Sequence, residues 1–193
     1  MFTKNIKFKN FITKKKSKNI KILRNFIKNK SLLKNYPLLK SLTNKFEYSF
    51  QKKKIKSFKK YQEVNLIGMG GSILGAEAIY DFLKYKVNKK FSFYNNLQIQ
   101  RVPKTNKKNI NLVISKSGNT LETVSNFNLL LQSQKKNKNV ILCEKKNNFL
   151  SLLAKKLKAE ILEHKNYIGG RYSVFSETGM LPAELMGLNE KKF

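Results

Sequence analysis

Residues 115–120 read Ser-Lys-Ser-Gly-Asn-Thr and stand between an apolar run and a helical pattern. The apolar residues from Ile110 to Ile114 predict a strand that is buried on both faces. Val124, Phe127 and Leu131 then recur at helical spacing. A turn that ends a strand and opens a helix favours anions, because the first helical N–H groups lack intrahelical partners and the dipole is positive there. The three hydroxyls and one ammonium of this turn indicate a phosphate ligand.

A second turn of the same kind, Gly-Met-Gly-Gly-Ser at residues 68–72, follows the apolar run Val64–Ile67. We expect a helix from about Ser72 to Lys84, with Ser72 capping its first turn. Two such turns on neighbouring strands of one sheet would face one ligand from two sides. Taken alone, this turn is equally consistent with a tight strand-to-helix connection that binds nothing.

This glycine turn does not match the common nucleotide-binding motifs. Its glycines fall at positions 68, 70, 71 and 75, which departs from the G-x-G-x-x-G spacing. Asn95 and Asn96 stand where a dinucleotide-binding domain carries an acidic residue. No Gly-Lys-Ser/Thr follows, so the turn is not a Walker loop either.

Strand and helix patterns alternate from residue 61 onward. Such alternation predicts parallel strands joined by helices, and therefore an α/β, doubly wound sheet. Ligands of these sheets bind beyond the carboxyl ends of the strands, where the strand order switches. We expect strands at Val64–Ile67, Lys90–Asn95, Ile110–Ser115, Val140–Cys143 and Ala159–Leu162, with helices after the first, third and fourth and a loop or short helix at 96–109.

Residues 1–60 differ from the rest in composition. We expect a loosely ordered basic arm at 1–18 and a helix from Asn19 to about Lys34, ended by Pro37. Residues 37–60 are ambiguous, although the three lysines at 52–54 with Ile55 and Phe58 fit a solvated helix face. We therefore divide the chain into a basic N-terminal arm and helix, 1–60, and an α/β domain, 61–193.

The charge of the chain has two interpretations. Its 193 residues are 40% hydrophobic, as in a folded domain, yet 41 Lys and Arg against 11 Asp and Glu leave a net charge of +30. Such a charge attracts polyanions such as nucleic acid or an anionic membrane. Lys, Asn, Ile, Phe and Tyr are over-used together, however, and all have A/T-rich codons. Because asparagine has no reason to rise in a nucleic-acid binder, coding bias explains the composition better, and we expect no specific nucleic-acid partner.

Few side chains in the sequence are suited to hold a metal. Cys143 is the only cysteine and His164 the only histidine, so neither a disulfide framework nor a zinc site is expected. We expect no metal and no cofactor, and a reducing, cytoplasmic location. No apolar run approaches the roughly 18 residues of a membrane span, so we expect no membrane partner. His164 is expected to be a strand-end residue.

A third turn, Gly169–Ser173, places two glycines before Arg171. Glycines free the backbone, and the guanidinium offers a planar, permanently charged fork. The alternative is an ordinary Gly-Gly turn with a surface arginine. For residues 115–120 the alternative is an elaborate helix cap, with Asn119 or Ser117 at the N-cap and Glu122 behind it. A cap needs one hydroxyl and three are present, which favours a ligand.

Together these motifs resemble the glucose-6-phosphate isomerase (phosphoglucose isomerase) family. The matching segments are Gly68–Ser72, Val113–Thr123, Gly169–Val174 and Gly179–Ala183, in this order. Any one of them would indicate only the wider sugar-isomerase class, whereas all of them in sequence are specific. The resemblance covers about Val64 to Leu188, and residues 1–60 contribute little to it.

The resemblance implies a flavodoxin-like sugar-isomerase (SIS) domain that interconverts glucose 6-phosphate and fructose 6-phosphate without a metal or cofactor. It further implies a homodimer for the full-length family member. Arg171 would be catalytic, stabilising the cis-enediolate that forms when a glutamate moves a proton between C2 and C1. The residues implied for the substrate are Ser72, Ser115, Lys116, Ser117 and Thr120 around the 6-phosphate, with Gly71 and Gly170 near the sugar.

The chain also departs from the family pattern. Asn119 stands where the family usually has threonine, and Glu177 is an unexpected acid beyond Arg171. The family's proton-transferring glutamate, ring-opening histidine and C-terminal lysine are expected beyond Leu188, so we expect an N-terminal fragment that binds substrate without turning it over. Glu177 does not stand in the motif of the family's base, and nothing in its setting in the sequence suggests a raised pKa. The alternative function is a non-catalytic sugar-phosphate-binding module, and a basic nucleic-acid binder is a third.

Overall fold

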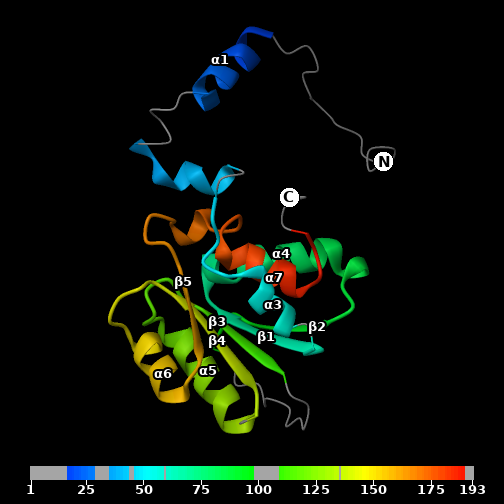
Figure 1. The fold of residues 1–193 in the computed structure, drawn as a ribbon, viewed down its shortest axis with the longest axis vertical. Helices are drawn as coiled ribbons and strands as arrows, with labels where there is room; N and C mark the ends of the chain where they lie inside the picture. Colours follow the sequence, from blue (N-terminus) through cyan, green and yellow to red (C-terminus); the bar gives the residue numbers. More distant parts are fainter. Residues whose placement is uncertain are drawn as a thin grey trace.

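The computed structural model describes residues 17–28, 35–43, 46–58, 60–97, 109–134 and 136–189. The arm expected at 1–16, the end of the first helix at 29–34 and the connection at 98–108 lie outside the described residues. The elements are α1 (Ser17–Lys28), η1 (Pro37–Leu42), α3 (Lys52–Phe58), β1 (Glu63–Gly68), η2 (Gly70–Ser72), α4 (Leu74–Leu83), η3 (Lys84–Lys86), β2 (Lys90–Tyr94), β3 (Ile110–Ile114), α5 (Leu121–Ser133), β4 (Lys138–Cys143), α6 (Phe149–Leu157), β5 (Glu160–Glu163), η4 (Gly170–Tyr172) and α7 (Glu177–Leu185), where η marks a 3₁₀ helix (Figure 1).

The five strands form one parallel sheet in the order β2-β1-β3-β4-β5. This is the flavodoxin-like order, and it confirms the α/β, doubly wound fold predicted from the sequence. From β1 the chain moves outward to β2, then returns to place β3 on the other side of β1. The order therefore switches between β1 and β3, the two strands that carry the first two turns.

Helices cover both faces of the sheet (Figure 1). On one face, α3, α4 and α7 pack against alternate residues of the strands, including Leu66, Leu112 and Leu142. On the other face, α5 and α6 cover the intervening residues, such as Val113 and Ile141. The alternation explains why the central strands are nearly continuous apolar runs: each face of the sheet has its own hydrophobic core.

One prediction about helix starts needs correction. Ser72 does not cap the helix after β1, because η2 forms first and α4 begins only at Leu74. The N–H groups of Ser72 and Ile73 donate to the carbonyls of Met69 and Gly70, at 3.1 and 3.0 Å, so backbone groups close this turn. Pro37 is the first residue of η1, where its fixed φ suits a helix start; whether the first helix runs on to Lys34 lies outside the described residues.

The amphipathic segment before the sheet is a helix, as the sequence indicated. In α3, Ile55 and Phe58 are buried in the same core as β1 and α7, whereas the three lysines at 52–54 are exposed. The helix therefore belongs to one packing face of the sheet. The division at residue 60 stays a prediction.

An asparagine ladder crosses the sheet near its amino-terminal edge. Asn65, Asn111 and Asn139 are register partners on β1, β3 and β4. Asn65 Nδ2 donates to Asn111 Oδ1 at 2.8 Å, and Asn111 Nδ2 donates to Asn139 Oδ1 at 2.9 Å. Gln134 and Asn137 complete the network, accepting from and donating to these amides at 3.0 Å. A slip by one residue would leave buried amides unpaired, so the ladder favours this register.

We expect Asn111→Leu to lower the free energy of unfolding by about 1–3 kcal/mol, because the amides around it lose a buried partner. Asn111 is fully buried, so water cannot replace that partner. Asn88→Leu, at an exposed position before β2, is the control. Urea denaturation of both variants and the parent measures the effect. Equal stability of the two variants would contradict a role for the ladder in holding the register.

Candidate functional site

The turn after β3 gathers three hydroxyls. Ser115 Oγ and Thr120 Oγ1 are 3.0 Å apart, and Ser117 Oγ is 3.4 Å from the same Thr120 oxygen. Ser115 Oγ also accepts from the N–H of Gly118 at 3.2 Å, and Ser117 Oγ accepts from the N–H of Asn119 at 3.2 Å. Gly118 has a φ of 71°, which favours glycine at this position. The hydroxyls predicted for a phosphate therefore lie together at the carboxyl end of β3.

The helix-cap alternative is wrong for this turn. The N-cap of α5 is Thr120, not Asn119 or Ser117, and the Thr120 side chain makes no capping hydrogen bond. The positive end of a 13-residue helix thus opens at the hydroxyls. This is the arrangement in which a helix N-terminus and side-chain hydroxyls serve one anion.

The loop between β4 and α6 supports the turn from behind. Asn119 Oδ1 accepts from the N–H of Phe149 at 2.8 Å, and the carbonyl of Gly118 accepts from the N–H of Leu150 at 3.0 Å. A Cβ built on Gly118 would lie 2.1 Å from Asn148 Oδ1, so a side chain there would displace the Asn148 amide. Sequence reasoning missed these supports. A usable signal was present, because the Asn148-x-x-Ser151 spacing forms a capping box at the start of α6.

The first glycine turn lies beside the hydroxyl turn. Gly68 at the end of β1 is the register partner of Ile114 at the end of β3. A Cβ on Gly68 would lie 3.1 Å from the Ile114 carbonyl oxygen, which shows how closely the strands approach there. Ser72 follows in η2 and is partly exposed. The structure thus brings the two turns to the switch point of the sheet.

The third turn packs directly on the first. A Cβ on Gly71 would lie 2.3 Å from the carbonyl oxygen of Gly170 and 2.9 Å from the backbone N of Arg171. Ser173 Oγ fastens the contact, donating to the carbonyls of Gly170 at 2.6 Å and Gly71 at 3.3 Å. Arg171 lies in η4 with an exposed side chain that forms no ion pair with another described residue. The glycine turn therefore lies next to both of the other turns, and Ser173 is a further residue that holds the third turn against it.

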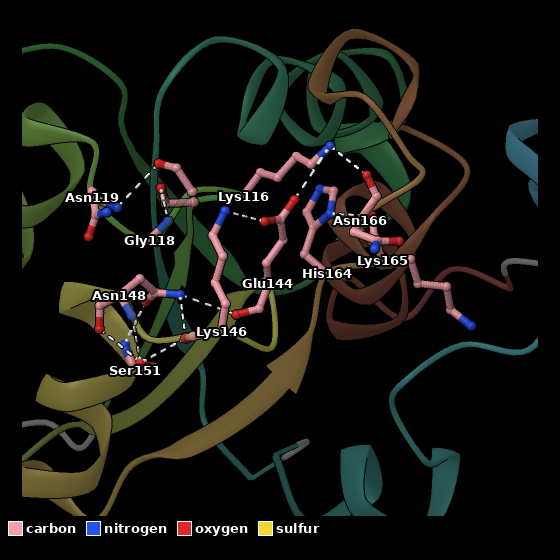
Figure 2. Close-up of polar contacts among 12 residues, drawn as sticks. Lys116, Gly118, Asn119, Glu144, Lys146, Asn148, Ser151, His164, Lys165 and Asn166 are labelled. Carbon is pink, nitrogen blue, oxygen red and sulfur yellow. Dashed lines mark hydrogen bonds and ion pairs between the residues drawn. The ribbon is translucent and has the colours of Figure 1, made fainter.

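Lys116 is the predicted site residue whose side chain has another partner. Its ammonium donates to the carbonyl of Asn166 at 2.8 Å and lies 3.6 Å from Glu144 Oε1. Figure 2 shows the side chain reaching across Glu144 toward the loop that follows β5. Glu144 also pairs with Lys146, and the two ammonium groups, Lys146 foremost, hold the pKa of this carboxyl below its ordinary value. The ammonium therefore lies on a loop contact rather than among the hydroxyls.

His164 lies where the sequence placed it, directly after β5. Its side chain is buried, with Nδ1 3.1 Å from the Lys165 carbonyl oxygen, while Nε2 has no hydrogen-bond partner among the described residues. Burial, more than any neighbouring charge, lowers the pKa of the imidazole, which favours its neutral form. Within the described parts of the chain, no three His, Cys, Asp or Glu side chains gather as metal ligands would. Nor does any helix in those parts have the length and apolar character needed to cross a membrane.

The structure corrects the expectation for Glu177. This side chain is 1% exposed at the first residue of α7, and burial raises the pKa of its carboxyl above the ordinary value. Glu177 Oε1 accepts from the N–H of Ser49 at 2.9 Å, and Ser49 Oγ donates to the carbonyl of Glu163 at 2.8 Å. The carboxyl thus fastens the segment before α3 to the start of α7, and the Ser49 hydroxyl fastens the same segment to the end of β5.

Most of this chain is similar in sequence to proteins of one family. The family model described as phosphoglucose isomerase matches residues 34–191. Glucose-6-phosphate isomerase of Methanocaldococcus jannaschii is 36% identical over 157 residues, which cover 72% of this chain and 36% of that protein. The namesake enzyme of Campylobacter jejuni is 30% identical over 168 residues, or 81% of this chain and 41% of that protein. The chain thus spans well under half the length of these curated relatives.

Solved structures show the same fold at low sequence identity. A hypothetical protein of Thermus thermophilus, TT0462, aligns with a TM-score of 0.65 at 19% identity and covers 90% of this chain and 45% of that one. Tagatose-6-phosphate ketose/aldose isomerase of Escherichia coli aligns with a TM-score of 0.55 at 16% identity over 88% of this chain and 47% of that one. These likenesses support the fold alone.

We expect Glu177→Gln to change how stability depends on pH. Because the folded state raises the pKa of this carboxyl above its ordinary 4.5, the folded chain binds the proton more tightly than the unfolded chain. The stabilisation that this carboxyl contributes is therefore greatest below its pKa in the unfolded chain. It declines as the pH rises through its pKa in the folded chain. Glutamine keeps an oxygen for the Ser49 N–H and cannot ionise.

The free energy of unfolding of Glu177→Gln, minus that of the parent, should therefore increase from weakly acidic toward neutral pH. Urea denaturation at a series of pH values measures this difference. Glu47→Gln, which removes an exposed carboxylate of the neighbouring segment, controls for net charge. A difference for Glu177→Gln that stays constant with pH, or decreases, would contradict the buried-carboxyl assignment.

Proposed function

The chain belongs to the phosphoglucose isomerase family, and on that premise we propose that it binds a hexose 6-phosphate for the interconversion of glucose 6-phosphate and fructose 6-phosphate. The observation that carries the proposal is the meeting of three turns from separate parts of the chain. Gly68–Ser72 and Ser115–Thr120 end adjacent strands, and Gly169–Ser173 packs against the first of them. The proposal places one small ligand between the hydroxyl turn, which would bind its anion, and the cationic Arg171.

In this proposal the phosphate lies at the start of α5. Ser115, Ser117 and Thr120 donate hydroxyl hydrogens to its oxygens, and the first N–H groups of the helix add their partial positive charge. Ser72 approaches from the β1 side. Lys116 belongs to the same turn through its backbone. A free hexose lacks the dianion that all these donors recognise, so the phosphate supplies most of the discrimination.

The sugar then extends toward the glycine contact and Arg171. A Cβ built on Gly170 would meet no other atom within 4 Å, so this glycine leaves open space for the sugar, while Gly71 packs directly against the Gly170 carbonyl. Isomerisation moves a proton between C2 and C1 and places negative charge on the oxygens of an enediolate intermediate. A fixed guanidinium beside those oxygens stabilises the charge where it develops, which is the catalytic role that we propose for Arg171. The proton itself requires a base within hydrogen-bond reach of C2 and C1.

The setting of Glu177 does not fit the role of that base. Its carboxyl is buried and already accepts a hydrogen bond from the Ser49 backbone. We accordingly propose that Arg171 and the turns bind and polarise the substrate. The proton-transferring base is then a residue other than Glu177. We also propose a cytoplasmic homodimer for the full-length enzyme.

We expect the double variant Ser117→Ala/Thr120→Ala to weaken binding of fructose 6-phosphate by more than about tenfold. Each hydroxyl donates to a charged group, a bond worth about 1.5–3 kcal/mol, and tenfold corresponds to about 1.4 kcal/mol. Calorimetry with the whole chain measures the affinity. Ser125→Ala, which removes a hydroxyl one turn further along α5, should retain parent affinity.

Two further titrations identify what the parent chain recognises. Free fructose should bind far more weakly than fructose 6-phosphate. The affinity for fructose 6-phosphate should also exceed that for a nucleic-acid oligomer at raised salt, where polyanion binding falls steeply. Equal affinity for fructose and its phosphate, or an unchanged affinity in the folded double variant, would contradict the proposed site.

A further inference from the structure

The Lys116 side chain leaves the hydroxyl turn from which it starts. Its Nζ is hydrogen-bonded to the Asn166 carbonyl at 2.8 Å and lies 3.6 Å from Glu144 Oε1 (Figure 2). The Glu144 N–H in turn donates to the Lys116 carbonyl at 3.1 Å, so the two residues are joined through both backbone and side chain. The contact thus spans from the end of β3, past the end of β4, to the loop after β5.

Asn166 lies in the short loop that leads to Arg171. The loop begins at His164, whose N–H donates to the Cys143 carbonyl at 2.8 Å and holds the end of β5. It ends at Ser173, whose hydroxyl is bonded to Gly71 and Gly170. Between these ends, Lys116 makes the only side-chain hydrogen bond that the described residues provide to the carbonyl of Asn166.

We propose that Lys116 is a positioning residue, whose ammonium holds the 164–169 loop so that Arg171 keeps its distance from the phosphate turn. This inference rests on the proposed hexose 6-phosphate site and assigns a task to one side chain within it. Glu144 keeps the ammonium directed at Asn166, and the phosphate is left to the hydroxyls and the start of α5. The side chain therefore connects the two parts of the proposed site, and in this proposal it does not contact the ligand.

A positioning role and a direct phosphate contact predict different losses of affinity for the two ligands, inorganic phosphate and fructose 6-phosphate. If Lys116 positions Arg171, Lys116→Met should leave the affinity for inorganic phosphate within about twofold of a charge-matched control, since a charge that does not contact the phosphate is screened at moderate salt. Its affinity for fructose 6-phosphate should fall further, by about fivefold to tenfold, as for one misaligned polar contact. A direct phosphate contact would weaken both ligands equally.

Lys146→Met is the matched control. Lys146 pairs with the other oxygen of Glu144 and is not bonded to Asn166. Its substitution by methionine removes the same charge as Lys116→Met. Calorimetry of both variants with the two ligands gives the ratio of affinities, which should drop for Lys116→Met and not for Lys146→Met. Lys116→Arg can still donate to the Asn166 carbonyl and the Glu144 carboxylate, so it should restore most of the ratio.

A second readout needs no ligand. Amide hydrogen exchange in the whole chain should be faster over residues 165–172 in Lys116→Met than in Lys146→Met, with exchange in β1 and β3 unchanged. Equal exchange in the two variants, or equal loss for both ligands, would overturn the positioning role. If the parent chain bound neither ligand, the proposed function would fail, while the exchange comparison would still decide what Lys116 does.

Discussion

The backbone of Gly71 rests against the backbone of Gly170 too closely for any side chain to come between them. This contact joins two segments that are about a hundred residues apart in the sequence, and Ser173 closes it with hydrogen bonds to both carbonyls. The end of β1 is in turn fixed beside the end of β3 by the parallel register. Through these two contacts the glycine turn lies next to both the hydroxyl turn and the arginine turn.

The sheet that supplies this register is stabilised by two kinds of interaction. Apolar side chains fill a separate core on each face. At the amino-terminal edge, the asparagine ladder makes one register favourable over its neighbours, because buried amides must find partners. The proposed ligand edge lies at the opposite ends of the same strands. Its hydroxyls are therefore free to interact with an anion, since holding the sheet together does not depend on them.

The fold and the placing of the first two turns at the carboxyl edge of the sheet were predictable from the sequence because their signals are local. A strand such as Ile110–Ile114 is recognisable from its own apolar residues, and the small-residue turn that follows marks a strand end. The direction of the Lys116 side chain was not predictable, because its partners Glu144 and Asn166 come from two other strand ends. Glu177 is similar: the Ser49 N–H that it binds lies 128 residues away in the sequence, so its burial depends on tertiary packing.

The central claim is that the three turns form one site for one hexose 6-phosphate. The most direct measurement is an NMR titration of the isotope-labelled chain with glucose 6-phosphate, at salt high enough to suppress non-specific anion binding. The account predicts that amide resonances of residues 68–72, 115–120 and 169–173 shift together along a single saturation curve. Shifts confined to the lysine-rich surface, or separate curves for the three turns, would contradict it.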